Sequence, residues 1–400
     1  MEQNKKEALF TPEFIKILVM ALAFFLSIMF LTSGIPGHIT ATSGDAFIGG
    51  LMTTVFMVAA ILTRPVIGYI IQKANLNALN IVTVLSLALL IFALSLTEHT
   101  AVMLVLRVLQ GICFGILSTS IATMATSSMP KSRMGEGIGY YGMATSGGTS
   151  FAPMLALAIL QSFSYRALIL TSTALALVTF VLLLSTRTKE TEERDTKPLD
   201  DVEKLSFLDY AFDKDAVLPC AIVAFFSFTL GGVTSFLRPL SIEAEIESTV
   251  SLFFLVQAIV LLISKAVSGI VYDRYGHKMI LYPAAISGIL GLFLLSRVET
   301  TFVLLIAAVF YGIAYGFLTT TLQTLAVSRV EKHKQGTANA MFLSFMDLGM
   351  ALGSPILGLV AGALSYHGIY AVSIIFILAL VVVYTVTIGK EEKLHEKSRA

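Results

Sequence analysis

Long apolar runs separated by short polar segments dominate this chain. One crossing of a bilayer takes about 20 mostly apolar residues, and runs of that length occur twelve times. The expected membrane spans are residues 14–36, 46–71, 76–96, 101–128, 135–160, 165–185, 216–238, 249–272, 278–296, 301–328, 336–364 and 368–388. The runs are apolar throughout, whereas strands of a membrane barrel alternate in polarity over about ten residues. Because lipid offers no partner for open backbone groups, the pattern predicts an all-α membrane protein with twelve transmembrane helices.

The composition leads to the same class of protein. Of the 400 residues, 56% are hydrophobic and 13% are charged, whereas a soluble domain has about 25% charged residues. The formal net charge of +1 leaves no basic excess for binding nucleic acid. Cys113 and Cys220 lie in apolar runs without the spacing of a disulfide framework or a metal site. We therefore expect the lipid bilayer as a partner, and no nucleic acid, metal or cofactor.

Basic residues between the spans predict the orientation of the chain. If both termini are cytoplasmic, 21 of the 27 Lys and Arg residues lie in cytoplasmic loops and tails. Three, Arg166, Arg238 and Arg297, lie in the outer loops. Cytoplasmic loops of membrane proteins carry an excess of Lys and Arg. The asymmetry predicts a multi-pass protein of the cytoplasmic membrane with both termini inside.

One long polar connection divides the chain. Residues 186–215 are rich in charge and have six spans on each side, which predicts two six-helix bundles over residues 1–185 and 216–400 with a cytoplasmic linker between them. Within the linker, LSFLDYAF places Leu205, Leu208 and Phe212 on one helical face. The segment is either an interfacial helix that leads into the seventh span or an ordinary flexible linker.

The two halves repeat at an offset of 201 residues. TRPVIGYIIQK (63–73) aligns with SKAVSGIVYDR (264–274), which pairs Arg64 with Lys265 and Gly68 with Gly269. The same register pairs Gly111 with Gly312, Gly115 with Gly316, Gly135 with Gly336 and Tyr165 with Tyr366. A register that holds over a hundred residues predicts parallel repeats, related by an axis along the membrane normal and sharing a central interface.

Three segments resemble motifs of the major facilitator superfamily. GIVYDRYGHK (269–278) is similar to its Gly-x-x-x-Asp-Arg-x-Gly-Arg/Lys-Lys signature, and LRVLQGICFG (106–115) to its Arg-x-x-Gln-Gly motif. GYYGMATSGGTSFAPMLA (139–156) resembles the Gly- and Pro-rich motif of the drug and metabolite:proton antiporter branch, although Ala152 and Ala156 replace glycines. In the first-half loop, Gln72 and Lys73 stand where the family has Asp and Arg. The resemblance implies the twelve-span major facilitator fold and transport by alternating access.

Four charged residues are left inside the spans. A charge in a span is costly and usually faces the bundle interior or marks a substrate or proton pathway. Arg107, beside Gln110, is expected in such an interior site unless it snorkels outward, and the resemblance implies a role for it in proton coupling. Asp347 and Lys265 lie at similar depths, so Asp347 is either a proton carrier beside a switchable cation or half of a permanent ion pair. Arg64 is the repeat equivalent of Lys265, and both are also assigned to gating.

Gating and bending are assigned to two further groups. Gly269, Asp273, Arg274, Gly276 and Lys278 belong to the tight loop after the eighth span, where Asp273 is either a latch that breaks as the halves move or a static staple. Gly148 and Pro153 in the fifth span, with Gly353 and Pro355 in the eleventh, are expected to permit close packing and bending.

A central cavity should be lined by side chains of both halves. The candidates are Ser27, Thr32, Arg107, Tyr141, Phe228, Gln257, Tyr311 and Asp347. All six histidines are expected in loops or tails, and no protease, ATPase or hydrolase motif is present. We therefore expect a transporter and not an enzyme.

The leading functional hypothesis is proton-coupled efflux of a small amphipathic molecule. Uptake or facilitated diffusion of a small solute is an alternative, because the first span carries no acidic residue after residue 14 and only Asp347 is an acid in mid-span. A membrane sensor or scaffold without transport activity is an alternative of another class.

Overall fold

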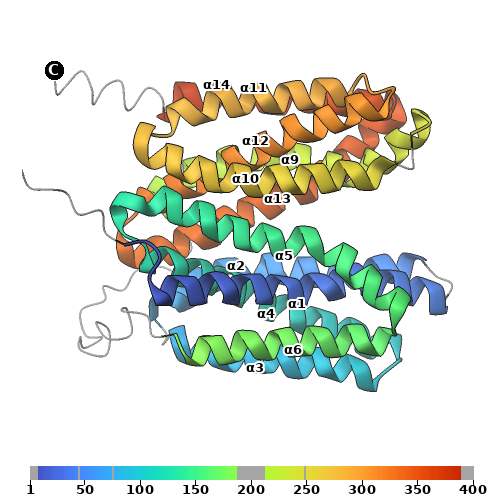
Figure 1. The fold of residues 1–400 in the computed structure, drawn as a ribbon, viewed down its shortest axis with the longest axis vertical. Coiled ribbons are helices and arrows are strands. Elements are labelled where there is room, and N and C mark those ends of the chain that lie inside the picture. Colours follow the sequence, from blue (N-terminus) through green and yellow to red (C-terminus); the bar gives the residue numbers. More distant parts are fainter. Residues whose placement is uncertain (1–7, 44–45, 74–75, 187–211, 247–248, 389–400) are drawn as a thin grey trace, which may run out of the picture. The chain divides into compact units, whose positions relative to one another are not determined.

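Twelve long helices make up the described part of the chain. The computed structural model describes residues 8–43, 46–73, 76–186, 212–246 and 249–388. Within these residues, twelve helices are long and apolar enough to cross a membrane (Figure 1). They are α1 (Pro12–Ser43), α2 (Ala46–Lys73), α3 (Leu76–Ala93), α4 (Thr100–Ser128), α5 (Met134–Ser162), α6 (Tyr165–Leu184), α9 (Lys214–Glu243), α10 (Val250–Tyr275), α11 (Lys278–Leu295), α12 (Thr301–Ser328), α13 (Gln335–Ala363) and α14 (Tyr366–Val386). The prediction of an all-α membrane protein with twelve helices is confirmed.

Two helices continue five or more residues beyond their predicted ends. The predicted first span stops at Pro36, but α1 runs to Ser43, and α9 passes Pro239 and ends at Glu243. A proline inside a membrane helix removes one backbone hydrogen bond, and neighbouring helices tolerate the local distortion. The expectation that every histidine lies in a loop or tail is consequently wrong for His38, which lies in α1. It is also wrong for His367, the second residue of α14.

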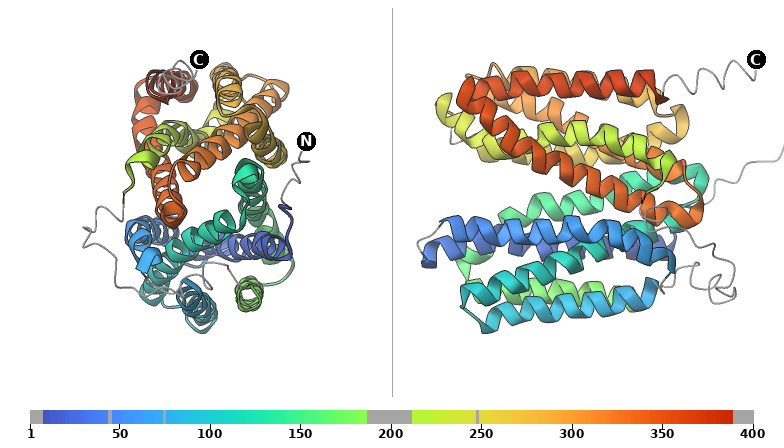
Figure 2. Two further views of the ribbon diagram at one scale, coloured as in Figure 1. Left: turned by 90° about the vertical axis from the view of Figure 1, so that its left-hand side faces the viewer. Right: turned by 180° about the vertical axis from the view of Figure 1, so that it is seen from behind.

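The helices form two compact units. The first contains residues 1–132, 144–213 and 330–341, and the second contains residues 133–143, 214–329 and 342–400. In the first unit, α2 packs along α4 and α1 along α6; in the second, α10 and α11 pack along α12, and α9 along α14 (Figure 2). The opening residues of α5 belong to the second unit, and those of α13 belong to the first.

The internal repeat reappears in the helix boundaries and in the packing. Helices α4, α5 and α6 begin at Thr100, Met134 and Tyr165, and α12, α13 and α14 each begin 201 residues later. Gly111 of α4 packs on the backbone of Phe56, and its equivalent Gly312 packs on the backbone of Gln257, again 201 residues further on. A Cβ at either glycine would press on a carbonyl oxygen of the neighbouring helix. The repeated glycines therefore set the close approach of α2 to α4 and of α10 to α12.

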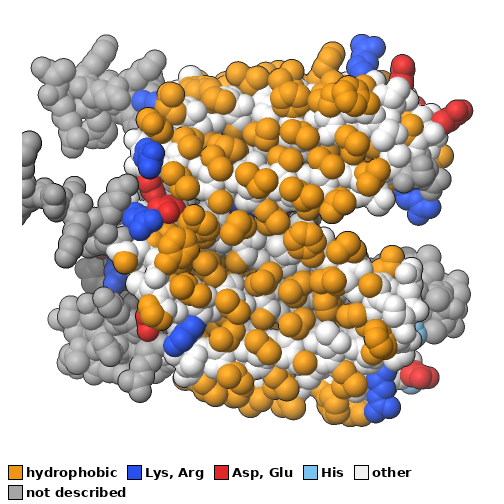
Figure 3. Space-filling view, viewed as in Figure 1, with side chains coloured by type: hydrophobic (Ala, Val, Ile, Leu, Met, Phe, Trp, Pro, Cys, Tyr) orange, Lys and Arg blue, Asp and Glu red, His pale blue; other side chains and the backbone are white. Residues whose placement is uncertain are grey.

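Large apolar side chains cover the flanks of the helices. Figure 3 shows hydrophobic side chains spread along these flanks and charged side chains near the helix ends. In α10, the exposed residues Leu255, Ile259, Ile263 and Val267 recur at every fourth position. This spacing marks one helical face, which is suited to contact with lipid.

The linker lies mostly outside the described residues. The structure describes neither Leu205 nor Leu208 of the expected interfacial helix, and it resumes at Phe212. Asp213, the next residue, is buried and forms an ion pair of 3.0 Å with Lys334 of the short helix η5 (Lys332–Lys334). The end of the linker is therefore attached to the segment just before α13.

Candidate functional site

Arg107 lies at the centre of a polar network in the first unit. It is fully buried, and its guanidinium donates three hydrogen bonds. Nε donates to the carbonyl of Met52 at 3.1 Å, Nη1 to Oε1 of Gln110 at 3.1 Å, and Nη2 to Oγ1 of Thr32 at 3.3 Å. The guanidinium carbon also lies 4.4 Å from the centre of the Phe56 ring. Arg107 therefore faces the bundle interior and does not snorkel outward.

The same network joins four helices. Gln110 is buried beside Arg107 on α4 and donates from Nε2 to the carbonyl of Leu90 on α3 at 3.1 Å. Thr32 belongs to α1 and Met52 to α2. The planar guanidinium can hold several acceptors at fixed angles. One cation thereby links α1, α2 and α4 directly, and α3 through Gln110.

A cation and an aromatic ring are paired at the same place in each repeat. The guanidinium carbon of Arg64 lies 5.9 Å from the centre of the Phe114 ring. In the second unit, Nζ of Lys265 lies 5.8 Å from the centre of the Tyr315 ring. Both members of the second pair stand 201 residues after those of the first. The repeat alignment pairs Arg64 with Lys265. It does not identify their aromatic partners, because these rings lie on other helices.

An aromatic and hydroxyl cluster lies beside Lys265 in the second unit. The Tyr311 hydroxyl and Oγ1 of Thr229 share a hydrogen bond of 2.9 Å between α12 and α9. The Phe226 ring lies 5.6 Å from those of both Tyr311 and Tyr315. The Tyr311 side chain is therefore buried and hydrogen-bonded, whereas Tyr315 keeps part of its surface exposed.

Asp347 and Lys265 both lie near Tyr315, but they do not form an ion pair. Asp347 of α13 is half-buried, and its carboxylate is close enough to act electrostatically on the Tyr315 hydroxyl. Among the described residues, Lys265 forms no ion pair or hydrogen bond. Its ammonium makes a cation–π contact with the ring of Tyr315. The permanent ion pair considered from helical depth is therefore absent, because similar depth along two helices does not set the direction of either side chain.

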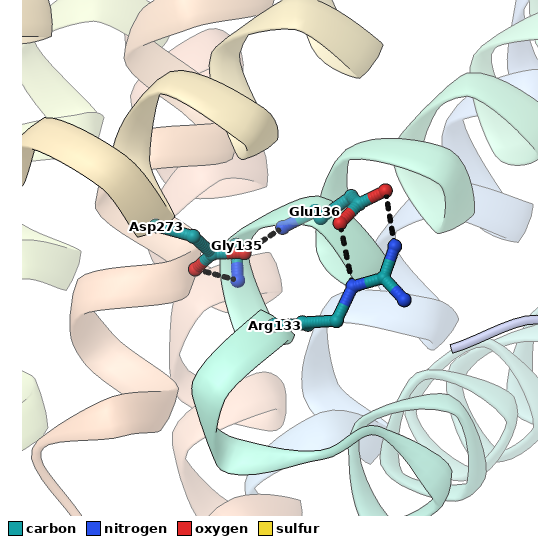
Figure 4. A network of polar contacts seen from close by, with 4 residues as sticks. All are labelled: Arg133, Gly135, Glu136 and Asp273. Atoms are coloured by element: carbon teal, nitrogen blue, oxygen red, sulfur yellow. Dashed lines mark hydrogen bonds and ion pairs between the residues drawn. The ribbon is translucent and has the colours of Figure 1, made fainter. Parts of the chain in front are cut away.

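Asp273 caps the start of α5. Its Oδ1 accepts from the Gly135 backbone N–H at 2.9 Å, and its Oδ2 accepts from the Glu136 backbone N–H at 2.8 Å (Figure 4). Arg133 forms a bidentate pair with Glu136 at 2.8 Å on the same turn. A carboxylate satisfies the unpaired N–H groups at a helix start and interacts favourably with the helix dipole. Asp273 of α10 therefore holds the N-terminus of α5.

Backbone geometry explains the glycines around Asp273. Gly276 has φ of 75°, a left-handed conformation that ends α10, and its N–H donates to the carbonyl of Tyr272 at 2.9 Å. Gly269 packs directly on the backbone of Gly135, so a larger residue at either position would separate α10 from the start of α5. Arg274 and Lys278 flank this turn at the end of α10 and the start of α11.

The predicted hinge residues lie at close helix contacts. Gly148 packs on Phe25 of α1 and Gly353 on the backbone of Phe228 of α9, while Pro153 and Pro355 lie inside α5 and α13. The helices remain continuous through both prolines. Close packing is therefore present at these sites, and bending is left as a prediction.

Several candidate lining residues are held by contacts between helices. Ser27 donates to the carbonyl of Ser172 at 2.8 Å, and the Phe228 ring stacks on Phe376 at 3.9 Å. Tyr141 and Gln257 are buried, and Nε2 of Gln257 has no hydrogen-bond partner among the described residues. Sequence reasoning missed Phe56, Phe114 and Tyr315, because an aromatic residue in an apolar helix carries no sign of its contact with a cation.

Comparison with known proteins identifies the family. The model of the Major Facilitator Superfamily matches residues 17–339 and 220–400. The chain belongs to the Major Facilitator Superfamily. Individual members of the family are similar to this chain over most of its sequence. The Staphylopine export protein of Staphylococcus aureus is 23% identical over 393 residues, which cover 92% of this chain and 94% of that protein.

Two further comparisons agree with this assignment. The Multidrug resistance protein MdtG of Escherichia coli is 25% identical over 337 residues, which cover 81% of this chain and 79% of that protein. The crystal structure of the human organic anion transporter MFSD10 has a TM-score of 0.77 at 14% identity and covers 93% of this chain and 99% of its own. This facilitator is therefore a multi-pass membrane transporter of small molecules, with two pseudo-symmetric six-helix bundles, and it is not an enzyme.

Proposed function

We propose that this facilitator exports a small amphipathic molecule across the cytoplasmic membrane by alternating access, in exchange for protons. The observation that carries the proposal is the buried Arg107 network. A charge held inside a span usually belongs to a substrate or proton pathway. Here the guanidinium is bonded to groups on α1, α2 and α4. Two relatives with export or drug resistance in their names support the outward direction.

Asp347 is the proton carrier in this proposal. It is a half-buried acid in the middle of α13, about 18 Å along the helix from its start at 1.5 Å per residue. A carboxylate in such surroundings takes up a proton more readily when no cation is close. Among the described residues, the Lys265 ammonium forms no ion pair with this carboxylate.

Asp273 is the latch, and the tightly packed α5 and α13 are the moving helices. Asp273 holds the start of α5 through two backbone hydrogen bonds, and these can break without unfolding either helix. Gly148 with Pro153, and Gly353 with Pro355, supply the bending points. The bundles comprise residues 1–185 and 216–400, both termini and the 186–215 linker are cytoplasmic, and Tyr141, Gln257 and Tyr311 contribute to the substrate pathway.

The test begins by identifying exported compounds. Metabolites of the medium and of the cells are compared between cells with and without the transporter, and the compounds that depend on it are then supplied to inside-out membrane vesicles. With an acidic lumen, proton exchange should drive these compounds into the vesicles, and nigericin should abolish their accumulation. The nigericin-treated vesicles give the accumulation that occurs without a pH gradient.

Other outcomes would support the other candidate functions. Accumulation only down a concentration gradient, unaffected by nigericin, would indicate facilitated diffusion. Compounds that decline in the medium because the transporter is present would indicate uptake. No transporter-dependent compound in either compartment would favour a sensor or scaffold.

A further inference from the structure

Lys265 is a charged group that the proposed exchange at Asp347 does not itself require. It lies on α10, eight residues before Asp273, which is about 12 Å deeper along the helix. The lipid-facing side of α10 carries Ile263 and Val267. Lys265 lies two positions from each, about 200° around the helix, and so points away from lipid.

The side chain of Lys265 lies between helices. A Cβ on Gly142 of α5 would lie 3.0 Å from the Lys265 Cδ and 3.4 Å from its Nζ, so this glycine provides the space through which the side chain passes. The ammonium ends 5.8 Å from the centre of the Tyr315 ring. Lys265 and Tyr315 both keep part of their surface exposed.

No anionic side chain in the described part of the chain pairs with this ammonium. Lys265 forms neither an ion pair nor a hydrogen bond within the described residues. A contact with an aromatic face replaces only part of the lost hydration of a cation. Arg107 offers the contrast, because its charge is held by three hydrogen-bond acceptors on neighbouring groups. A cation left in this condition inside a transporter favours an anionic group of the substrate.

We infer that Lys265 binds an acidic group of the transported molecule, so that the substrate is a small organic acid whose apolar body packs on Tyr315. This inference rests on the proposed transport function and specifies its substrate class. A carboxylate would complete the charge pair, and the ring of Tyr315, which keeps part of its surface exposed, offers an apolar face. The acidic group can belong to a simple organic anion or to a zwitterion.

Asp347 makes the two kinds of acid distinguishable. A simple anion at Lys265 repels the Asp347 carboxylate and favours its protonation, which would couple anion and proton in the same direction. The ammonium group of a zwitterion instead competes with the proton for Asp347. Competition of this kind is what exchange requires, so the zwitterion is the class consistent with proton-coupled export.

The first experiment uses the compounds that cells export. Metabolites in the medium are compared for cells carrying the wild type, Lys265→Gln, Lys265→Arg and, as a control, Lys332→Gln on the exposed surface of η5. The transporter-dependent compounds should carry an acidic group. Lys265→Gln should reduce their export at least tenfold, while Lys265→Arg keeps most of it and Lys332→Gln keeps all of it.

The second experiment measures binding without any gradient. Purified transporter is titrated with four molecules of similar shape: phenylalanine, 3-phenylpropionate, phenylalaninamide and 3-phenylpropionamide. They are a zwitterion, an anion, a cation and an uncharged amide, respectively. Thermal unfolding reports binding, because a ligand of the native state raises Tm. The two carboxylates should stabilise the wild type more than their amides, and Lys265→Gln should remove that difference. Phenylalanine should exceed 3-phenylpropionate if the substrate is a zwitterion.

Specific results would overturn the inference. Transporter-dependent export only of compounds that lack an acidic group would do so. So would carboxylates that raise Tm no more than their amides do. A carboxylate that raises the Tm of Lys265→Gln as much as that of the wild type would also overturn it. Monodisperse elution and cooperative unfolding of each variant show that it is folded. Binding is measured without a pH gradient. If the wild type binds carboxylates but a pH gradient does not drive their transport, the exchange mechanism is refuted and the substrate class still stands.

Discussion

Arg107 and Lys265 carry the same charge in different surroundings. Arg107 donates to three acceptors on the neighbouring groups Met52, Gln110 and Thr32. Lys265 meets one aromatic ring. Because a buried charge requires compensation, Arg107 is satisfied within the protein, whereas Lys265 is suited to receiving its partner from a ligand. The type of cation agrees with these surroundings, since a guanidinium holds several acceptors at fixed angles and an ammonium acts as a compact point charge.

Replacement of Arg107 by lysine should test whether hydrogen-bond geometry matters in addition to charge. An ammonium on a single chain cannot occupy the positions of Nε, Nη1 and Nη2 together. We expect Arg107→Lys to reduce gradient-driven transport in vesicles by roughly tenfold or more, equivalent to about 1.4 kcal/mol. The control is Arg297→Lys, an exposed residue before α12. Full activity of Arg107→Lys would show that the cluster needs only a positive charge.

Neutralising Asp347 should separate substrate binding from coupling. Asparagine has the size of aspartate but cannot take up a proton near neutral pH. Vesicles with Asp347→Asn should therefore bind substrate and exchange it down a concentration gradient, but should not accumulate it in response to a pH gradient. Glu299→Gln, at an exposed acid, is the matched control. Unchanged accumulation with Asp347→Asn would assign the proton to another group.

At the scale of helices, glycine positions set how closely the spans pack. Within a lipid environment helices gain little from hydrophobic burial, so close contact between backbones contributes much of their association. In α13, Gly349 packs on the carbonyl of Ala224 and Gly353 packs on that of Phe228, whereas a Cβ at Gly362 would meet nothing within 4 Å. Two contacts one turn apart align α13 with α9.

Gly353→Ala and Gly362→Ala therefore make a matched pair on one helix. The methyl group at position 353 would push against the Phe228 backbone, which cannot move as a flexible side chain can. We expect Gly353→Ala to lower the stability of the purified protein by about 1–3 kcal/mol, the usual effect of overpacking. Gly362→Ala should leave Tm unchanged or raise it slightly, because alanine favours helix more than glycine does. Equal melting temperatures for the two variants would contradict the contact.

The start of α5 provides the second test at this scale. Asp273 accepts from the N–H groups of Gly135 and Glu136, and Asp273→Asn removes the charge and leaves a single acceptor oxygen. If these bonds latch one conformation, the substitution should shift the populations of inward and outward states. Alkylation of single cysteines introduced at opposite ends of α5 measures the shift. Glu331→Gln, at an exposed residue outside this contact, is the control, and an unaltered labelling pattern with Asp273→Asn would reduce the carboxylate to a static cap.

At the scale of the whole molecule, the distribution of basic residues predicts the orientation. Of 27 Lys and Arg residues, 21 lie in the loops and tails assigned to the cytoplasm. In a background with Cys113→Ala and Cys220→Ala, Thr196→Cys in the linker should react with a membrane-impermeant maleimide in inside-out vesicles. Glu299→Cys, in an expected outer loop, should react in intact cells. The reverse pattern would invert the topology.

Much of this molecule follows from local sequence patterns. All twelve predicted spans begin within two residues of the observed helices, which α9 illustrates with a predicted start at 216 and an observed start at Lys214. Lipid makes this possible, because every apolar run of sufficient length must satisfy its own backbone and therefore becomes a helix. The larger differences, at the ends of α1 and α9, lie beside Pro36 and Pro239, where both helices continue through the proline.

The sequence alone determined the class of protein, the number and starting positions of its helices, the repeat and the small set of charges within the spans. Each of these depends on composition or spacing along the chain. Only the tertiary structure decided what the charged residues meet: the oxygens around Arg107, the backbone amides at Asp273 and the aromatic ring beside Lys265. Such partners lie on other helices, and nothing in the local spacing of one helix specifies which residue of another will face it.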